Sequence, residues 1–150
     1  SDLAKNVASG AYYCEQAKVK YHDSYTSGNA TMTTYNKYTP NFKCSSDGNN
    51  KGVVNASVGL LTYDEVVYAG GYHAQTNRKY YLYNSANTMW TMSPAGFTSG
   101  SANVWYVITS GDLYNGNVRN IDAIRPVINL TANTQISSGD GTKENPYVIE

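Results

Sequence analysis

The side chains that most often carry out catalysis are few in this chain and poorly spaced for it. Its two histidines, His22 and His73, stand 51 positions apart, and neither has a Glu or His at i+4. This spacing excludes a zinc site of the HExxH type. The sequence also lacks the GxSxG, SxxK, P-loop and GxGxxG motifs of common hydrolases and nucleotide-binding enzymes. No catalytic machinery can be assembled from these signals.

The carboxylates give no better catalytic pair. Asp64 and Glu65 are adjacent, but the start of a helix explains both. Asp112 and Asp122 are better placed, yet no partner base is identifiable for either. His73 is expected at the surface or as a helix cap. We therefore expect no enzymatic activity, no cofactor and no metal.

The composition favours recognition by uncharged polar groups. The 150 residues include eleven basic and eleven acidic side chains, so the formal net charge is zero. A neutral chain lacks the basic surface of a nucleic-acid-binding protein, and no apolar run is long enough to span a membrane. Asn (17), Tyr (15), Ser (14) and Thr (14) are abundant. These residue types are typical of surfaces that bind ligands by stacking and adaptable hydrogen bonds.

The two cysteines, Cys14 and Cys44, form one even pair without a CxxC spacing. This pattern favours a disulfide over a metal or redox site, and two free thiols in a cytosolic protein are the alternative. A disulfide between them would stabilise the folded state by about 3–4 kcal/mol in the chain-entropy model. No signal peptide is visible, so secretion would imply that a targeting segment or N-terminal anchor has been removed. Without repeats or a linker, we expect one domain over 1–150, with 1–57 as an N-terminal part and 58–150 as core and binding surface.

A short helix over 63–69 is the clearest local prediction. Thr62 followed by Glu65 forms a capping box, and Leu61 with Val66 forms the matching hydrophobic staple. Asp64 and Glu65 favour the positive end of the helix dipole. The pair Gly70-Gly71 then supplies a left-handed stop.

After Lys79 the pattern changes to short aromatic or β-branched runs bounded by turn residues, which predicts an antiparallel sheet. The runs are 80–83, 89–92, 102–109, 124–130 and 147–149. Alternation in the third run places Val104, Tyr106 and Ile108 on one face and Trp105, Val107 and Thr109 on the other. Gly111-Asp112 is a plausible hairpin tip.

Residues 90–122 concentrate aromatic, amide and hydroxyl groups between these strands, and the residue types are those that anchor interfaces. The aromatic anchors expected here are Trp90, Trp105, Tyr106 and Tyr114. The hydrogen-bonding residues expected here are Asp112, Asn115, Asn117, Arg119, Asn120 and Asp122. Trp90 and Trp105 have an equally good alternative as core residues.

The order of motifs resembles a group of bacterial surface domains with a C-type-lectin fold, which is related to the fold of formylglycine-generating enzymes. The motifs are VGLLTYDEV (58–66), GG (70–71), YL (81–82), MWTMSP (89–94), VWYV (104–107), GDL (111–113), IRPVINL (124–130), GDGT (139–142) and NPYVI (145–149). The resemblance implies an α+β fold with short helices packed on a small antiparallel sheet with long irregular loops. It also implies a Cys14–Cys44 pair and a prepilin-like membrane anchor.

A narrower resemblance is to the variable proteins of diversity-generating retroelements, in which an asparagine-rich ribbon varies on a fixed scaffold. The positions implied to vary are Ile108, Ser110, Asp112, Tyr114, Asn115, Gly116, Asn117, Arg119, Asn120 and Asp122. The positions implied to stay fixed are Val107, Gly111, Leu113, Val118 and Arg125-Pro126. Ala123-Ile124 departs from the commoner Gly-Val before the Arg-Pro pair.

Two further departures separate this chain from functional relatives of the fold. The second half has no cysteine, which argues against formylglycine chemistry, and Pro94 has no neighbouring carboxylate, so calcium is not expected. We therefore expect an extracellular, surface-anchored domain that binds a protein or glycan on another cell or surface. The alternatives are a structural, pilin-like subunit and, more distantly, an enzyme.

Overall fold

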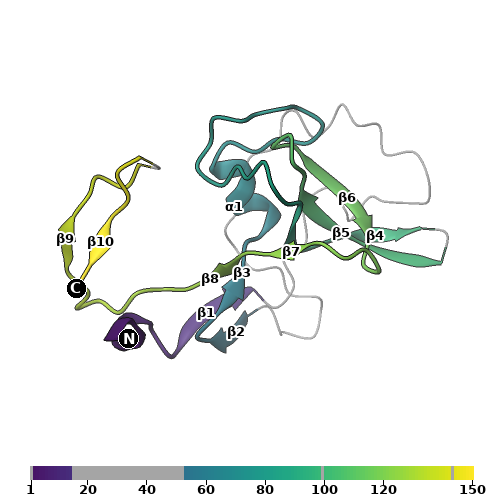
Figure 1. Cartoon of the computed structure of the whole chain (residues 1–150). Helices are drawn as coiled ribbons and strands as arrows, with labels where there is room; N and C mark the ends of the chain where they lie inside the picture. Colours follow the sequence, from purple (N-terminus) through teal and green to yellow (C-terminus); the bar gives the residue numbers. More distant parts are fainter. Residues whose placement is uncertain (1, 15–52, 99, 143) are drawn as a thin grey trace.

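The computed structural model describes residues 2–14, 53–98, 100–142 and 144–150. Within them, strands dominate and one short α-helix is present (Figure 1). The elements are the 3-10 helix η1 (Asp2–Asn6), β1 (Ala11–Cys14), β2 (Val53–Ala56), β3 (Gly59–Leu60), α1 (Tyr63–Tyr68), β4 (Met89–Thr98), β5 (Ser101–Val107), β6 (Leu113–Asn117), β7 (Ala123–Ile124), β8 (Pro126–Val127), β9 (Ile136–Ser138) and β10 (Val148–Ile149). The expected short helices on a small antiparallel sheet are therefore found in part: one short α-helix is present, and the described residues form a mixed, mostly β structure.

The helix α1 begins where its sequence signals predict. The Thr62 hydroxyl accepts a hydrogen bond from the Glu65 backbone N–H, and the Glu65 carboxylate accepts one from the Thr62 N–H at 2.7 Å. The capping box is thus confirmed in both directions. Ala69 closes the helix, and Gly70 adopts a φ of +111°, the left-handed conformation expected after the last turn.

Four strands form the central sheet in the order β6-β5-β4-β7. β5 pairs antiparallel with both β4 and β6, as expected. β7 pairs with β4 in parallel. The sheet is curled, and α1 covers one of its faces (Figure 1). The β4–β5 register shifts between Trp90 and Pro94. Proline lacks a donor for the ladder, so an irregularity is where a strand accommodates it.

The core lies between α1 and this sheet. Tyr63, Val66 and Val67 of α1 pack with residues from β4, β5 and β6 and from the preceding loop, which are Met89, Ala95, Trp105, Val107, Leu113, Tyr80 and Leu82. The rings of Tyr63 and Trp105 are 4.7 Å apart. The Ser93 hydroxyl accepts a hydrogen bond from the Tyr63 N–H at 2.8 Å, which joins the start of α1 to β4.

Two of the expected strands are altered. Residues 80–83 form a turn, closed by a hydrogen bond from the Tyr83 N–H to the Tyr80 carbonyl. The expected strand over 124–130 is split into β7 and β8, separated by Arg125, whose guanidinium donates to the Leu82 carbonyl at 2.9 Å. This hydrogen bond holds the segment between β7 and β8 against the turn at 80–83.

Three smaller sheets complete the described structure. β1 pairs with β2, β3 with β8, and β9 with β10. The β9–β10 pair, with its connecting loop, is called the hairpin here. It stands apart from the central sheet (Figure 1). Cys14 ends β1, whereas Cys44 lies outside the described residues, as does most of the expected N-terminal part, so the disulfide stays a prediction.

Candidate functional site

The register of the central sheet places four side chains in one row. Trp90 of β4 is opposite Tyr106 of β5 and beside Ile124 of β7, while Tyr106 is opposite Tyr114 of β6. Partners in a ladder point to the same face of a sheet. Ile124, Trp90, Tyr106 and Tyr114 therefore form a row across all four strands, which we call the cross-strand row.

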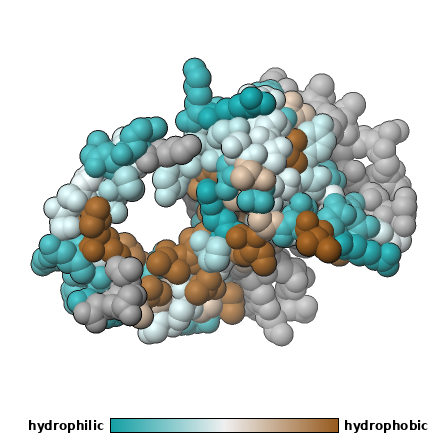
Figure 2. All heavy atoms as spheres, viewed as in Figure 1, coloured by the Kyte–Doolittle hydropathy of each residue, from teal (hydrophilic) through white to brown (hydrophobic). Residues whose placement is uncertain are grey.

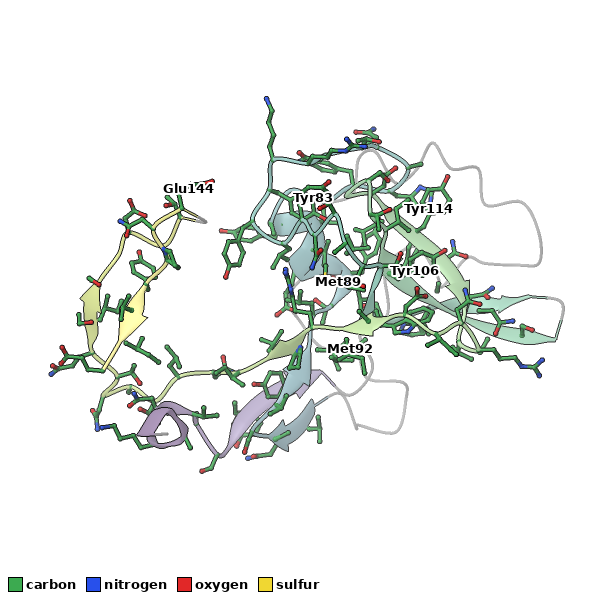
Figure 3. The ribbon with its side chains drawn as sticks, in the orientation of Figure 1. Tyr83, Met89, Met92, Tyr106, Tyr114 and Glu144 are labelled. Atoms are coloured by element: carbon green, nitrogen blue, oxygen red, sulfur yellow. The ribbon has the colours of Figure 1, made fainter. Side chains whose placement is uncertain are left out.

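The row lies on the face of the sheet away from α1, called the outer face here. Trp105 and Val107, the neighbours of Tyr106 along β5, are 0% and 2% exposed and pack under α1. Tyr106 therefore points the other way. Figure 3 shows Tyr106 and Tyr114 near each other, with Met89 on the side of α1. Ile124 is 64% and Tyr114 38% exposed, and Trp90 and Tyr106 are half-buried.

Aromatic contacts hold the row together. The rings of Trp90 and Tyr106 meet edge to face, 5.4 Å apart, an arrangement worth about 0.5–1.5 kcal/mol beyond burial. Tyr106 also lies over Gly116, where an added Cβ would stand 2.6 Å from the ring. A side chain at position 116 would therefore require the Tyr106 ring to move, while the implied variation at Gly116 stays a prediction. At the edge of the sheet, the Tyr114 ring is 5.4 Å from the ring of His73.

A loop of residues 118–122, called the crossing loop, joins β6 to β7 across the outer face. β6 ends opposite Asn103, whereas β7 begins beside Met89, at the other end of the sheet. The loop starts in a turn in which the Asn117 side-chain oxygen accepts a hydrogen bond from the Arg119 N–H at 3.0 Å. Asn117 thus positions the loop, while Arg119 and Asn120 are exposed.

The charge of Asp122 reaches the cross-strand row. Burial raises the pKa of the Tyr106 phenol above its ordinary value, and the Asp122 carboxylate and the Tyr114 phenol raise it further. The phenol of Tyr106 is therefore held as a neutral hydrogen-bonding group at physiological pH. An aromatic row beside a carboxylate suits stacking and hydrogen bonding with a ligand.

Apolar side chains of the crossing loop extend this surface, and sequence reasoning missed them. Ile121 is 100% exposed and Val118 is 49% exposed. Val118 is thus not part of the buried core, and its implied role as a fixed position stays a prediction. Exposed aliphatic residues grouped beside exposed aromatic rings mark interaction surfaces. The signal available in the sequence was two β-branched residues within an Asn- and Asp-rich loop.

Several expected site residues lie elsewhere. Trp105 is fully buried, so its expected role as a ligand anchor is wrong and its alternative as a core residue is confirmed. Asn115 is exposed, but its register opposite Trp105 places it on the α1 side of the sheet. Ile108 and Ser110 are half-buried in the tight loop between β5 and β6, which the Gly111 N–H closes on the Ile108 carbonyl at 2.9 Å.

Asp112 is buried beneath that loop, so the expectation that it contacts a ligand is also wrong. It is 8% exposed, and its Oδ1 has no hydrogen-bond partner among the residues that the structure describes. His73, expected at the surface, is 3% exposed and packs edge-on against Trp105 at 5.2 Å. Burial lowers the pKa of His73, and the Asp112 charge opposes that shift. Burial, with Asp112 adding to it, raises the pKa of Tyr80 to about 12.

The described residues contain no group of three or more His, Cys, Asp or Glu side chains that would hold a metal ion. Within the same part of the chain, no helix is long and apolar enough to cross a bilayer.

Comparison with known proteins places the chain in a family. A family model described as "Domain of unknown function (DUF6273)" matches residues 20–132, which is more than half of the chain. No curated protein and no solved structure matches the chain.

Proposed function

We propose that this chain, which belongs to the DUF6273 family, is an extracellular, non-enzymatic ligand-binding domain whose binding surface is the outer face. The observation that carries the proposal is the cross-strand row, in which Ile124, Trp90, Tyr106 and Tyr114 are in register on four strands. Arg119, Asn120 and Asp122 of the crossing loop supply polar groups beside it. The ligand is a protein or a glycan on another cell or surface.

The mechanism is non-covalent recognition. Tyr114 offers an exposed aromatic surface, and Trp90 supports it through Tyr106, so the rings lose little conformational freedom on binding. Arg119 is exposed, and its planar guanidinium can pair with a carboxylate or a planar amide of a ligand. Ile121 supplies apolar contact at the rim.

A finer proposal concerns fold and diversity. The C-type-lectin resemblance implies a ligand surface between Trp90 and Asp122, and the retroelement resemblance implies variable positions from Ile108 to Asp122, a range that includes most of the crossing loop. Arg119 and Asn120 are exposed and Asp122 is half-buried, while Val107 and Leu113 are buried. Substitution of exposed loop residues usually costs less than about 0.5 kcal/mol. Deep sequencing of the locus in one culture should then show variation at these codons and a nearby template that differs at adenines.

The binding proposal is tested with a double variant, Tyr114→Ala with Arg119→Ala. The purified domain and the variant are applied to an array of glycans and bacterial surface proteins. The ligands that bind the wild-type domain should bind the variant with an affinity lower by about thirtyfold or more, because two anchoring side chains are removed. Thermal unfolding of the variant checks that it is folded. Retained binding by a folded variant would reject the outer face as the binding surface.

One observation favours a second function as a structural subunit. Ile128, Leu130, Ile136, Tyr147 and Val148, in the hairpin and the segment leading to it, are 44–57% exposed. A two-stranded hairpin is marginal without further packing, so a neighbouring subunit could cover it. Assembly into fibres or oligomers as the concentration rises would support that function, and a monomer at all concentrations would reject it.

A further inference from the structure

A cleft separates the hairpin from the rest of the molecule. Its larger part has a volume of about 610 Å³ and is lined by Leu61, Tyr81, Arg125, Pro126 and, from the hairpin side, Thr142 and Pro146. A second part of about 430 Å³ shares Tyr81 and Thr142, and adds Arg78, Lys79 and Glu144. Figure 2 shows this space as a hollow, and Figure 3 places Tyr83 and Glu144 on its opposite sides.

Both walls of the cleft are held by local interactions. On the body, the Arg125 guanidinium donates to the Leu82 carbonyl at 2.9 Å, which fixes β8 against the turn at 80–83. On the hairpin, the Asp140 side chain accepts from the Thr142 N–H at 2.9 Å, and the Thr142 hydroxyl accepts from the Asn145 N–H at 3.1 Å. These bonds define the local backbone on each side of the cleft.

The charge of the lining differs from that of the whole chain. The chain has equal numbers of basic and acidic residues. Among the described residues that line the cleft, Arg78, Lys79 and Arg125 are basic and Glu144 is the acidic one. The cleft therefore carries a net positive charge, which attracts anionic groups.

The rest of the lining is apolar or aromatic. Leu61, Leu82 and Val127 offer aliphatic surface, and the Tyr81 ring is 68% exposed. A sugar hydroxyl placed against the aliphatic wall would lose its hydrogen bonds to water without replacement. Apolar side chains would instead gain about 25 cal/mol for each Å² that they bury there.

We propose that this cleft binds an extended peptide segment in which acidic side chains alternate with apolar ones. The apolar side chains pack against Leu61 and Val127, and the carboxylates pair with Arg78 and Lys79 at the entrance. Alternate side chains of an extended peptide point to opposite sides, so one segment meets both the apolar and the basic groups. The cleft shares no residue with the cross-strand row, so the two proposals stand or fall separately.

The test uses a fluorescein-labelled peptide of alternating valine and glutamate, with fluorescence anisotropy as the readout. The double variant Arg78→Glu with Lys79→Glu should weaken binding by about tenfold or more, since two exposed attractions become repulsions. Tyr81→Ala, which leaves the charges intact, should also weaken binding. Both changes are at exposed positions, so folding is expected to survive. Added salt should weaken binding by the wild-type domain, because entrance charges are screened.

Matched controls separate this site from general charge effects. Lys5→Glu reverses an exposed charge outside the lining of the cleft and should leave the peptide affinity unchanged. A peptide with glutamine in place of glutamate should bind the wild-type domain more weakly than the acidic peptide does, and charge reversal in the cleft should not weaken its binding further. The proposal is overturned if the acidic peptide shows no saturable binding, or if charge reversal in the cleft has no effect. Binding of polygalacturonate without binding of the peptide would also overturn it.

Discussion

Trp90 and Tyr106 meet edge to face across β4 and β5, with ring centroids 5.4 Å apart and an interplanar angle of 88°. This contact stands at the centre of the cross-strand row. Tyr106 in turn lies over Gly116 of β6, where no side chain competes for its place. The outer face is thus a set of rings held by one another and by a glycine, which suits a preformed binding surface.

The two tryptophans should respond differently to truncation. Trp105→Ala is expected to lower the free energy of unfolding by about 3–5 kcal/mol, because a fully buried indole leaves a cavity under α1. Trp90→Ala should cost less, roughly 1–2 kcal/mol, because part of its surface is already exposed. Urea denaturation of both variants measures the difference. Equal costs would contradict the assignment of the two rings to opposite faces.

Two glycines with positive φ provide a matched pair. Gly111 has a φ of +90° and an added Cβ would stand 1.8 Å from the Asn77 carbonyl oxygen, whereas Gly100 has a φ of +77° and an added Cβ there would meet no described atom within 4 Å. Alanine at either position meets backbone strain of about 1–2 kcal/mol. Gly111→Ala must also displace the segment at Asn77, so we expect it to be at least about 2 kcal/mol less stable than Gly100→Ala. Similar melting temperatures for the two variants would argue against this packing of the loop.

The contribution of the capping-box hydrogen bonds can be separated from that of the negative charge of Glu65. Thr62→Ala removes the hydroxyl that accepts from the Glu65 N–H and should lower the free energy of unfolding by about 1 kcal/mol. Glu65→Gln keeps an acceptor for the Thr62 N–H and should cost less. Chemical denaturation compares the two. A larger loss for Glu65→Gln would show that the helix start depends on the negative charge rather than on the reciprocal hydrogen bonds.

Stability should fall as the pH is lowered through the titration of His73. Burial lowers the pKa of His73 in the folded protein, so below the unfolded value of about 6.5 the unfolded chain binds a proton that the folded protein excludes. The contribution is complete above that value and is lost as the pH falls through the lower folded pKa. Between about pH 7.5 and 5.5, the wild type should therefore lose more stability than His73→Phe. Equal losses would exclude a role for His73.

Local signals predicted the helix because each of them acts within a few residues. The Thr62–Glu65 pair and Gly70 determine where α1 begins and ends, and both were found as expected. Alternation along β5 was predicted equally well. The sequence did not predict which face of β5 is buried, because Val104 and Tyr106 on one face are about as apolar as Trp105 and Val107 on the other. Only the position of α1 decides which ring is exposed.

The turn at 80–83 shows a different limit of prediction from sequence. Tyr80 and Leu82 are buried while Tyr81 is 68% exposed, so the burial alternates as it would in a strand. The backbone nevertheless turns, and the Tyr80 hydroxyl donates to the Gly111 carbonyl at 2.9 Å. The alternating burial of residues 80–82 therefore results from packing against the distant loop at Gly111 and not from a strand. Long-range docking also formed the cleft, whose residues are spread from 61 to 146 and share no sequence motif.

The most direct test of the central proposal is to map where a ligand binds. The ¹⁵N-labelled domain is titrated with a ligand found on the array, and backbone amide shifts are followed by NMR. We expect the largest changes at Tyr106, Tyr114 and residues 118–124, with the α1 side of the sheet unaffected. Changes centred on the cleft or on the hairpin, with the cross-strand row unchanged, would contradict the outer face as the binding surface.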